Sequence, residues 1–288
     1  MSTVQELSTK EKPQWCPGCG NFSLHMALKT ALSELGIPRE KAVMATGIGC
    51  SGKSNHYINT YGYESLHGRS VPTAAGIKLA NHELTVIAEG GDGDGYGIGS
   101  AHFLHSFRRN IDMLYIVHDN AIYGLTTGQA SPMTQKGMKT KSTPHGNLEI
   151  PFNPLAVAIA AGGTFAARVF AGDIMHMKDV FKQAIAHKGF ALVDVLQPCV
   201  TFNKLNTFQF WQQRVYKLDA THDTSNKAAA LEKAFEEVNS GYAKIPIGVF
   251  YKEERPTYES EAPQLQSGPL VKHAVANEAI EKALDEFM

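Results

Sequence analysis

Leu84–Gly99 has the sequence LTVIAEGGDGDGYGIG and joins an apolar run to a helical stretch through a turn of glycine and aspartate. Its first part, Leu84–Ala88, is short and apolar, which is typical of a buried parallel strand. Apolar residues at helical spacing resume over Ile98–Phe107. Other short apolar runs are also predicted to be buried strands: Ala42–Thr46, Met113–Val117, Phe165–Val169 and Ala191–Leu196.

Helical stretches alternate with the predicted strands. They are Asn21–Leu35, Thr73–Asn81, Leu155–Ala161 and Ile174–His187, with Gly36 ending the first and Asp173 capping the last. This alternation predicts an α/β fold with a doubly wound, mostly parallel sheet. In such sheets a ligand lies beyond the carboxyl ends of the strands. The loops expected at that edge are Ala45–Gly52, Glu89–Gly99, His118–Gln129 and Gln197–Asn203.

The rest of the chain is less regular. Residues 131–150 are polar and rich in Thr, Lys, Pro and Gly, which indicates a long functional loop. After about Leu218 the alternation of strand and helix is lost. We therefore predict one domain over residues 1–217 and a C-terminal arm over residues 218–288 that packs on a partner subunit.

Composition narrows the possible partners. The chain has 27 Lys and Arg residues against 28 Asp and Glu residues, so no excess of charge suggests nucleic acid or a membrane surface. No apolar stretch approaches the ~20 residues of a membrane span, and Met1–Lys12 lacks the apolar core of a signal peptide. We expect a cytoplasmic protein, in which four cysteines are not paired as disulfides.

Each cysteine lies at a turn or at the end of a strand. Cys16 and Cys19 form a C-x-x-C turn in WCPGCG, Cys50 follows the first predicted strand, and Cys199 follows the last. Four thiolates suit a zinc ion or an iron–sulfur cluster. Only one pair is local in the sequence, which favours a cluster. A thioredoxin-like redox motif would leave Cys50 and Cys199 unexplained.

The glycine–aspartate turn indicates phosphate binding through a metal. No register of its glycines supplies G-x-G-x-x-G, so a dinucleotide site of the Rossmann type is disfavoured. The register Gly91-Asp92-Gly93 suits a diphosphate at a helix N-terminus with Mg²⁺ between phosphate and carboxylate. A second oxygen ligand is expected from a neighbouring strand end, where Asn120 lies 28 positions after Asp92.

A rival interpretation comes from GIGCSGKS, Gly47–Ser54, which matches the Walker A pattern G-x-x-x-x-G-K-[ST]. A P-loop requires the Lys-Ser pair to begin a helix whose N-terminus meets the phosphates. The residues that follow Ser54 are poor helix formers without helical apolar spacing. A P-loop NTPase is therefore the less favoured alternative.

Taken together, these motifs resemble the β subunit of a two-subunit 2-oxoacid:ferredoxin oxidoreductase, a family that includes 2-oxoglutarate synthases. The resemblance runs from about residue 15 to residue 260. Its segments are Trp15–Phe22 (WCPGCGNF), Gly47–Ser54 (GIGCSGKS), Leu66–Pro72 (LHGRSVP), Gly91–Gly99 (GDGDGYGIG), Asp119–Gln129 (DNAIYGLTTGQ), Gln197–Asn203 (QPCVTFN) and Phe250–Thr257 (FYKEERPT).

The resemblance implies that residues 1–217 are the diphosphate-binding half of a thiamine-diphosphate site and also carry one [4Fe–4S] cluster. The implied cluster ligands are Cys16, Cys19, Cys50 and Cys199. The implied Mg²⁺ ligands are Asp92, Asn120 and the carbonyl of Ile122. The implied cofactor-binding residues are Gly49, Cys50, Ser51, His67, Gly91, Asp92, Gly93, Asp94, Asn120, Tyr123, Gly124, Leu125 and Thr126.

The implied reaction is oxidative decarboxylation of a 2-oxoacid with coenzyme A to acyl-CoA and CO₂, reversible in CO₂ fixation. Electrons pass from thiamine diphosphate through the cluster to ferredoxin. A larger α subunit supplies the activating glutamate and the pyrimidine half-site, in an αβ or α₂β₂ assembly. An electron-transfer or assembly subunit that lacks the cofactor is a non-catalytic alternative.

The resemblance also implies catalytic roles for His67, Arg69 and Lys53. Arg69 would meet a substrate carboxylate, and His67 would handle a proton. Lys53 would favour a dicarboxylic substrate such as 2-oxoglutarate. Some relatives carry lysine where Thr127 stands here, so pyruvate or a broad range of 2-oxoacids stays open.

Overall fold

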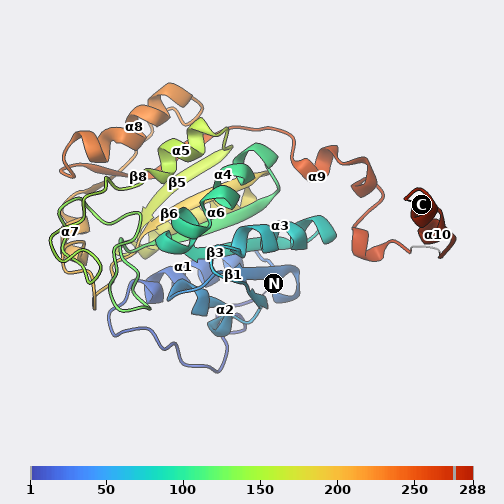
Figure 1. Cartoon of the computed structure of the whole chain (residues 1–288), viewed down its shortest axis with the longest axis horizontal. Helices are drawn as coiled ribbons and strands as arrows, with labels where there is room; N and C mark the ends of the chain where they lie inside the picture. Colours follow the sequence, from blue (N-terminus) through green and yellow to red (C-terminus); the bar gives the residue numbers. More distant parts are fainter. Residues whose placement is uncertain (1, 275–276, 288) are drawn as a thin grey trace.

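The computed structural model describes residues 2–274 and 277–287. One eight-stranded sheet forms its centre, in the order β2-β1-β3-β4-β6-β5-β8-β7 (Figure 1). The strands are β1 (Ala42–Thr46), β2 (Tyr61–Glu64), β3 (Thr85–Gly91), β4 (Met113–Asp119), β5 (Phe165–Phe170), β6 (Phe190–Leu196), β7 (Val215–Lys217) and β8 (Ile245–Lys252). All neighbouring strands are parallel except β5 and β8. The prediction of a mostly parallel α/β sheet is confirmed.

The central strands β4 and β6 are buried along their whole length because helices cover both faces of the sheet. Every residue of β4 and of β6 is buried. Along β4, Tyr115 belongs to the core cluster of one face and Ile116 to that of the other. Helices α1 (Asn21–Glu34) and α6 (Ile174–Ala186) pack on one face. The opposite face is covered by α3 (Ser70–Ala80), α4 (Ser100–Arg109), α5 (Pro154–Ala160) and α8 (Lys227–Asn239).

Two predicted helix boundaries have the expected chemistry. Gly36, just after α1, has φ +67°, a left-handed conformation that glycine adopts without steric cost. Asp173 precedes α6, and its carboxylate accepts a hydrogen bond from His176 N at 3.0 Å. The end of α1 and the start of α6 are therefore specified by local sequence.

The sheet extends beyond residue 217, where the sequence suggested that the domain ends. Strand β8 lies inside the sheet, between β5 and β7, and α8 packs beside it. Only the segment after about Thr257 runs away from the sheet, through α9 (Tyr258–Glu261) to α10 (Asn277–Asp285) (Figure 1). The expected arm is thus shorter than residues 218–288.

The segment after the Walker-like loop is more helical than its composition suggests. A 3₁₀ turn, η2 (Ser51–Lys53), leads into the short helix α2 (Ser54–Tyr57). The other short elements are η1 (Arg39–Lys41), the π-helix η3 (Gly93–Ile98), α7 (Phe208–Gln212), η4 (Pro263–Leu265) and η5 (Leu270–Lys272). Over residues 2–274 and 277–287, no helix combines the length and the apolar character needed to cross a bilayer.

Candidate active site

A cavity of about 140 Å³ lies at the carboxyl ends of β1, β3 and β4. All thirteen residues predicted to bind the cofactor line it. So do Ile122, the third predicted Mg²⁺ ligand, and two residues that the sequence did not identify, Ile48 and His118. The loops that follow separate strands therefore meet at one place, as expected for an open parallel sheet.

Asp92 lies at the N-terminus of the π-helix η3, a type of helix that often marks functional sites. Its side chain is buried, and the hydroxyl of Ser131 donates a hydrogen bond to its Oδ2. Burial raises the pKa of the Asp92 carboxyl to about 7, although the Ser131 bond opposes this shift. A buried carboxylate of this kind is stabilised in its charged form when a cation binds beside it.

The turn after β4 presents oxygen atoms near Asp92. Ala121 has φ +56°, which is uncommon for a residue other than glycine. Two hydrogen bonds hold it there: its N–H donates to Asp119 Oδ1 at 3.2 Å, and its carbonyl accepts from Thr134 Oγ1 at 2.7 Å. Asn120 Oδ1 accepts from Ile122 N at 3.1 Å and keeps a second lone pair. Strain maintained by its surroundings is typical of a functional turn.

These donors fit the predicted metal. A carboxylate, a side-chain amide oxygen and a backbone carbonyl, from Asp92, Asn120 and Ile122, are the hard oxygen ligands that Mg²⁺ prefers. Gly93 is required beside them, because a Cβ at that position would lie 2.1 Å from Cε1 of the Tyr123 ring. Tyr123 in turn donates from its hydroxyl to Gly93 O at 3.1 Å. The glycine–aspartate loop and the turn after β4 are thus fitted to each other.

The cysteine-bearing loops converge next to this cavity. Trp15 Nε1 donates to Cys50 O at 2.8 Å, which ties the C-x-x-C turn to the loop after β1. Gln197 Nε2 donates to Cys19 Sγ at 3.4 Å. A Cβ built on Gly124 would lie 3.5 Å from Cys199 Sγ and 3.8 Å from Cys50 Sγ. The two sulfur atoms from distant loops therefore face the same glycine.

The thiols influence one another electrostatically. Burial raises the pKa of Cys19 to about 12, and the other three cysteines add to the rise. Burial also raises the pKa of Cys50, followed by Cys199, while Lys53 opposes the shift. Within the part of the chain that the structure describes, no three His, Cys, Asp or Glu side chains are arranged to hold a single metal ion. The four thiols are nevertheless close enough for Cys16, Cys50 and Cys199 to raise the pKa of Cys19.

The three predicted catalytic residues are placed differently. His67 lines the cavity, and its Nδ1 is 2.6 Å from Asp94 Oδ1. Lys53 is half-buried near Cys50 and does not line the cavity. Arg69 is exposed at the start of α3, and its Nη1 donates to Gly68 O at 3.4 Å. Of the three, only His67 reaches the cavity.

The Walker-like loop is occupied by an acid of the chain itself. Ile48 N, which would be one of the phosphate-binding groups of a P-loop, donates to Asp94 Oδ1 at 3.0 Å. A Cβ on Gly47 would lie 2.0 Å from Asp94 Oδ2, so the carboxylate fills the space beside the loop. The carboxylate of Asp94 beside this loop would repel a phosphate. The loop is therefore not a P-loop, although the short helix α2 follows it.

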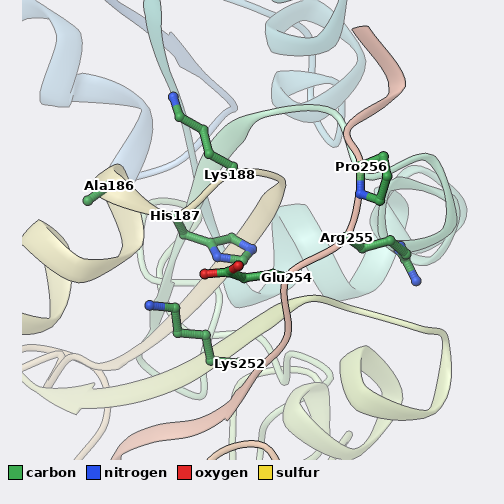
Figure 2. A pocket seen from close by; sticks show the side chains of 7 residues that line it. All are labelled: Ala186, His187, Lys188, Lys252, Glu254, Arg255 and Pro256. Carbon is green, nitrogen blue, oxygen red and sulfur yellow. The ribbon is translucent and has the colours of Figure 1, made fainter. Parts of the chain in front are cut away.

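A larger hollow, of about 450 Å³, lies at the start of β6 and the end of β8, and no cysteine lines it (Figure 2). Its walls carry Lys188, Lys252 and Glu254, and Arg255 donates to the backbone carbonyls of Phe107 and Gly162. Figure 2 shows the Arg255 side chain turned away from Lys252. Apart from the segment around Arg255, the hollow has none of the residues that the motifs single out.

Three polar residues at the site are not among the candidate site residues predicted from the sequence. Ser131 reaches Asp92 from the long loop 131–150, Gln197 joins Asn120 to Cys19, and His118 bonds Asn21 Oδ1 through its Nδ1 at 2.9 Å. Gln197 begins the segment Gln197–Asn203, so the sequence indicates its loop but not its contacts with Asn120 and Cys19. His118 likewise begins a loop expected at this edge, His118–Gln129, whereas Ser131 could be found only from the fold.

Comparison with known proteins agrees with this geometry. Residues 44–195 match the family model "Thiamine pyrophosphate enzyme, C-terminal TPP binding domain". Residues 199–267 match the family model for the C-terminal part of the beta chain of pyruvate ferredoxin oxidoreductase. The first match covers most of strands β1 to β6 and the residues that line the cavity, and the second begins at Cys199, includes β7 and β8, and runs into the segment after β8.

Individual relatives cover nearly the whole chain. The 2-oxoacid:ferredoxin oxidoreductase subunit beta of Sulfolobus sp is 45% identical over 95% of this chain and 93% of its own. The 2-oxoglutarate synthase subunit KorB of Methanocaldococcus jannaschii is 35% identical over 87% of this chain and 92% of its own.

One solved structure is also similar, that of 2-oxoglutarate:ferredoxin oxidoreductase from Magnetococcus marinus with 2-oxoglutarate, coenzyme A and succinyl-CoA bound. It aligns with a TM-score of 0.90 at 36% identity, over 98% of this chain and 96% of that one. The chain therefore belongs to the β subunits of the 2-oxoacid:ferredoxin oxidoreductases.

Proposed function

We propose that this β subunit, with a larger α subunit, oxidises 2-oxoglutarate and coenzyme A to succinyl-CoA and CO₂ and passes the electrons to ferredoxin. The observation that carries the proposal is the shared wall between the two predicted sites. Cys50 lines the cofactor cavity, and its sulfur faces Gly124 together with Cys199 Sγ. A cluster bound there would lie directly beside the cofactor.

Thiamine diphosphate, when bound, supplies the chemistry that cleaves the bond to the carboxyl carbon. The chain's own part is to hold the diphosphate and its metal. Asp92, Asn120 and the Ile122 carbonyl would ligate Mg²⁺, and Ser131 orients Asp92 through its hydroxyl. The N-terminus of η3 would place backbone N–H groups near the phosphates, as at other helix N-termini.

Cys16, Cys19, Cys50 and Cys199 would hold one [4Fe–4S] cluster, which accepts electrons one at a time. Gln197 supports this proposal, because its Nε2 donates to Cys19 Sγ while its Oε1 accepts from Asn120 Nδ2 at 3.3 Å. One side chain thus connects a predicted cluster ligand to a predicted Mg²⁺ ligand. Cys16 is exposed, whereas the other three cysteines are partly covered. The exposed side of the cluster site is the side from which ferredoxin would take electrons.

The proposed partner is supported by the size of the cavity. At about 140 Å³ it is smaller than the roughly 300–1,000 Å³ of a typical small-molecule pocket. Two of the residues that line it, Ile48 and Leu125, have exposed apolar side chains. A half-site completed by the α subunit, in an αβ or α₂β₂ assembly in the cytoplasm, accounts for both features.

The choice of 2-oxoglutarate depends on cations near the cavity. Lys53 lies beside Cys50, as the opposing effect of its charge on the Cys50 pKa indicates. Lys141, from the loop 131–150, donates to Thr127 Oγ1 at 2.9 Å, next to the cavity residue Thr126. Either ammonium would attract the distal carboxylate of a dicarboxylic substrate, which pyruvate lacks.

The test is anaerobic co-purification with the α subunit, followed by coenzyme A-dependent reduction of an electron acceptor across a panel of 2-oxoacids. We expect a brown complex with about four irons per β chain, bound thiamine diphosphate, and the highest kcat/KM for 2-oxoglutarate. Cys19→Ser should remove the visible absorption, and Asp92→Asn should remove the cofactor but leave the cluster.

Lys252→Ala, in the larger hollow, is the matched control and should retain cluster, cofactor and turnover. A colourless complex with one zinc per chain would contradict the cluster. ATP hydrolysis that Lys53→Ala abolishes, without bound thiamine diphosphate, would support the P-loop alternative. Activity unchanged by Asp92→Asn would favour a non-catalytic electron-transfer subunit.

A further inference from the structure

We propose that Asp94 is a positioning residue for His67, fixing the ring so that Nε2 is presented to the cofactor cavity as a hydrogen-bond acceptor. The family resemblance places Asp94 among the implied cofactor-binding residues. Its hydrogen bonds give it a different role. The inference relies on the proposed function for what His67 acts on, and on the geometry of this chain for the rest.

Three groups from two different loops converge on a single oxygen of Asp94. Its Oδ1 accepts from Ile48 N at 3.0 Å and from Gly68 N at 2.8 Å, and it lies 2.6 Å from His67 Nδ1. The Asp94 side chain is 1% exposed, whereas that of His67 is 37% exposed. The carboxylate is thus inside the protein, and the imidazole lies between it and the cavity.

The surrounding backbone leaves room for this carboxylate only because it contains glycine. A Cβ at Gly47 would lie 2.0 Å from Asp94 Oδ2, and one at Gly90 would lie 2.7 Å from the same atom. Gly68, whose N–H reaches Oδ1, has φ +71°. Asp94 Oδ2 is buried without a hydrogen bond in the described residues. Burying an acid so incompletely satisfied is costly, which argues for a role beyond packing.

The bonds determine which nitrogen of His67 carries the proton. Backbone N–H groups can only donate, so Asp94 Oδ1 acts as an acceptor toward Ile48 and Gly68. Because Asp94 Oδ1 is an acceptor, His67 Nδ1, which contacts the same oxygen, must carry a proton and donate it. In the neutral ring the proton is then on Nδ1, and the lone pair is on Nε2. This is the arrangement by which a carboxylate fixes the tautomer of a histidine.

The other side of the ring faces the predicted cofactor. His67 lines the cavity, and its ring lies edge-on to that of Tyr123, with centroids 6.3 Å apart. No hydrogen bond to Nε2 is present among residues 2–274 and 277–287. Nε2 is therefore available to accept a hydrogen bond or a proton from a group bound in the cavity.

The first test locates the proton directly. In ¹⁵N-histidine-labelled αβ complex, two-dimensional spectra of the ring nitrogens should show His67 with Nδ1 protonated and Nε2 unprotonated, with the signal assigned by its loss in His67→Gln. A neutral ring protonated on Nε2 would overturn the proposal. This spectrum does not depend on turnover, so it separates failure of the proposal from failure of the proposed function.

The second test asks whether Asp94 acts through His67. Asparagine keeps an oxygen for the two backbone donors but removes the charge, so Asp94→Asn should lower kcat about tenfold, and His67→Gln about 10²-fold or more. The double variant should be no slower than His67→Gln alone. Thiamine diphosphate affinity, measured by tryptophan fluorescence, should change less than threefold in each variant.

Multiplicative losses of kcat in the double variant, or a large loss of cofactor affinity in Asp94→Asn, would show that Asp94 only holds the two loops together. Circular dichroism and the cluster absorption of each variant establish that it is folded. His105→Gln, an exposed histidine on α4, is the control for substitution of a histidine as such.

Discussion

Arg168 and Asp194 form an ion pair in the interior of the sheet, with Nε donating to Oδ2 at 2.8 Å and side chains that are 2% and 0% exposed. They stand opposite each other on the neighbouring strands β5 and β6. Glu237 of α8 accepts a second bond from the guanidinium, and Tyr96 of η3 donates to Asp194 Oδ1 at 2.8 Å. The pair therefore connects the core to the helix that follows Asp92.

The first prediction concerns this pair. Arg168→Met should lower the free energy of unfolding by about 3–5 kcal/mol, because it leaves the buried Asp194 and the half-buried Glu237 without their cation. Denaturant unfolding, monitored by circular dichroism, measures the change. Lys272→Met removes one partner of the exposed Lys272–Glu83 pair and should cost less than about 1 kcal/mol. Equal losses of unfolding free energy in the two variants would contradict the claim that burial makes the Arg168 pair more costly to break.

The second prediction concerns the hydroxyl that orients Asp92. Ser131→Ala removes the donor to Asp92 Oδ2. Groups that orient a metal ligand typically contribute about 10–100-fold in metal affinity, so the apparent Kd for Mg²⁺ with thiamine diphosphate should rise by that factor. Tryptophan fluorescence titration at fixed thiamine diphosphate gives the Kd. Ser142→Ala, on the same loop, should leave it unchanged, and an unaltered Kd in Ser131→Ala would exclude this role.

Sequence patterns located the buried strands well because continuous apolar runs can be accommodated only where both faces are covered. Strand β1 has the predicted bounds, Ala42–Thr46. Strand β2 was not predicted, because all four of its residues are exposed at the edge of the sheet and carry no apolar pattern. Strand β8 was assigned to the arm, because it follows a segment without clear alternation. Its place in the sheet is set by pairing with β5, which lies far earlier in the chain.

The candidate site, like the fold, could be predicted only in part from the sequence. Glycine, aspartate and cysteine identified the loops of the site, because few other residues form such tight turns or bind metals. Ser131 could not be found, because its contact with Asp92 spans 39 residues and serine is common in loops. The resemblance implies catalytic roles for both His67 and Arg69, yet only His67 lines the cavity. The direction of a side chain depends on the backbone, here the positive φ of Gly68 between them.

The third prediction is a pH dependence of stability. Burial lowers the pKa of both His25 and His187 to about 4. In the unfolded chain a histidine has a pKa near 6.5. Between about pH 6.5 and pH 4 the unfolded state therefore binds protons that the folded state does not, and stability falls as the pH is lowered. Each histidine contributes up to about 1.4 kcal/mol per pH unit in this window.

His187→Gln tests the contribution of one of the two. Its side chain bonds Thr164 Oγ1 at 2.9 Å, so some stability is lost at every pH. The informative quantity is the slope of the unfolding free energy against pH between pH 6.5 and pH 5. In His187→Gln this slope should decrease by up to about 1.4 kcal/mol per pH unit, the contribution of one proton. A slope equal to that of the parent chain would show that His187 titrates alike in the folded and unfolded states.

The fourth prediction concerns substrate choice and the loop 131–150. Lys141 is fixed at two points on the turn beside the cavity: its N–H donates to Gly128 O, and its Nζ to Thr127 Oγ1, each at 2.9 Å. Thr127 has φ +74°, an outlier for a β-branched residue. Such strain is found where a turn has a functional role. The loop thus holds an ammonium group at the edge of the cofactor site.

If that ammonium meets the distal carboxylate of 2-oxoglutarate, Lys141→Ala should lower kcat/KM for 2-oxoglutarate about tenfold, which corresponds to about 1.4 kcal/mol. For pyruvate, which has no second carboxylate, kcat/KM should change less than twofold. Lys139→Ala removes a charge from the same exposed loop without a bond to Thr127 and serves as the control. A proportional loss for both substrates in Lys141→Ala would mean that the lysine orders the loop and does not select the substrate.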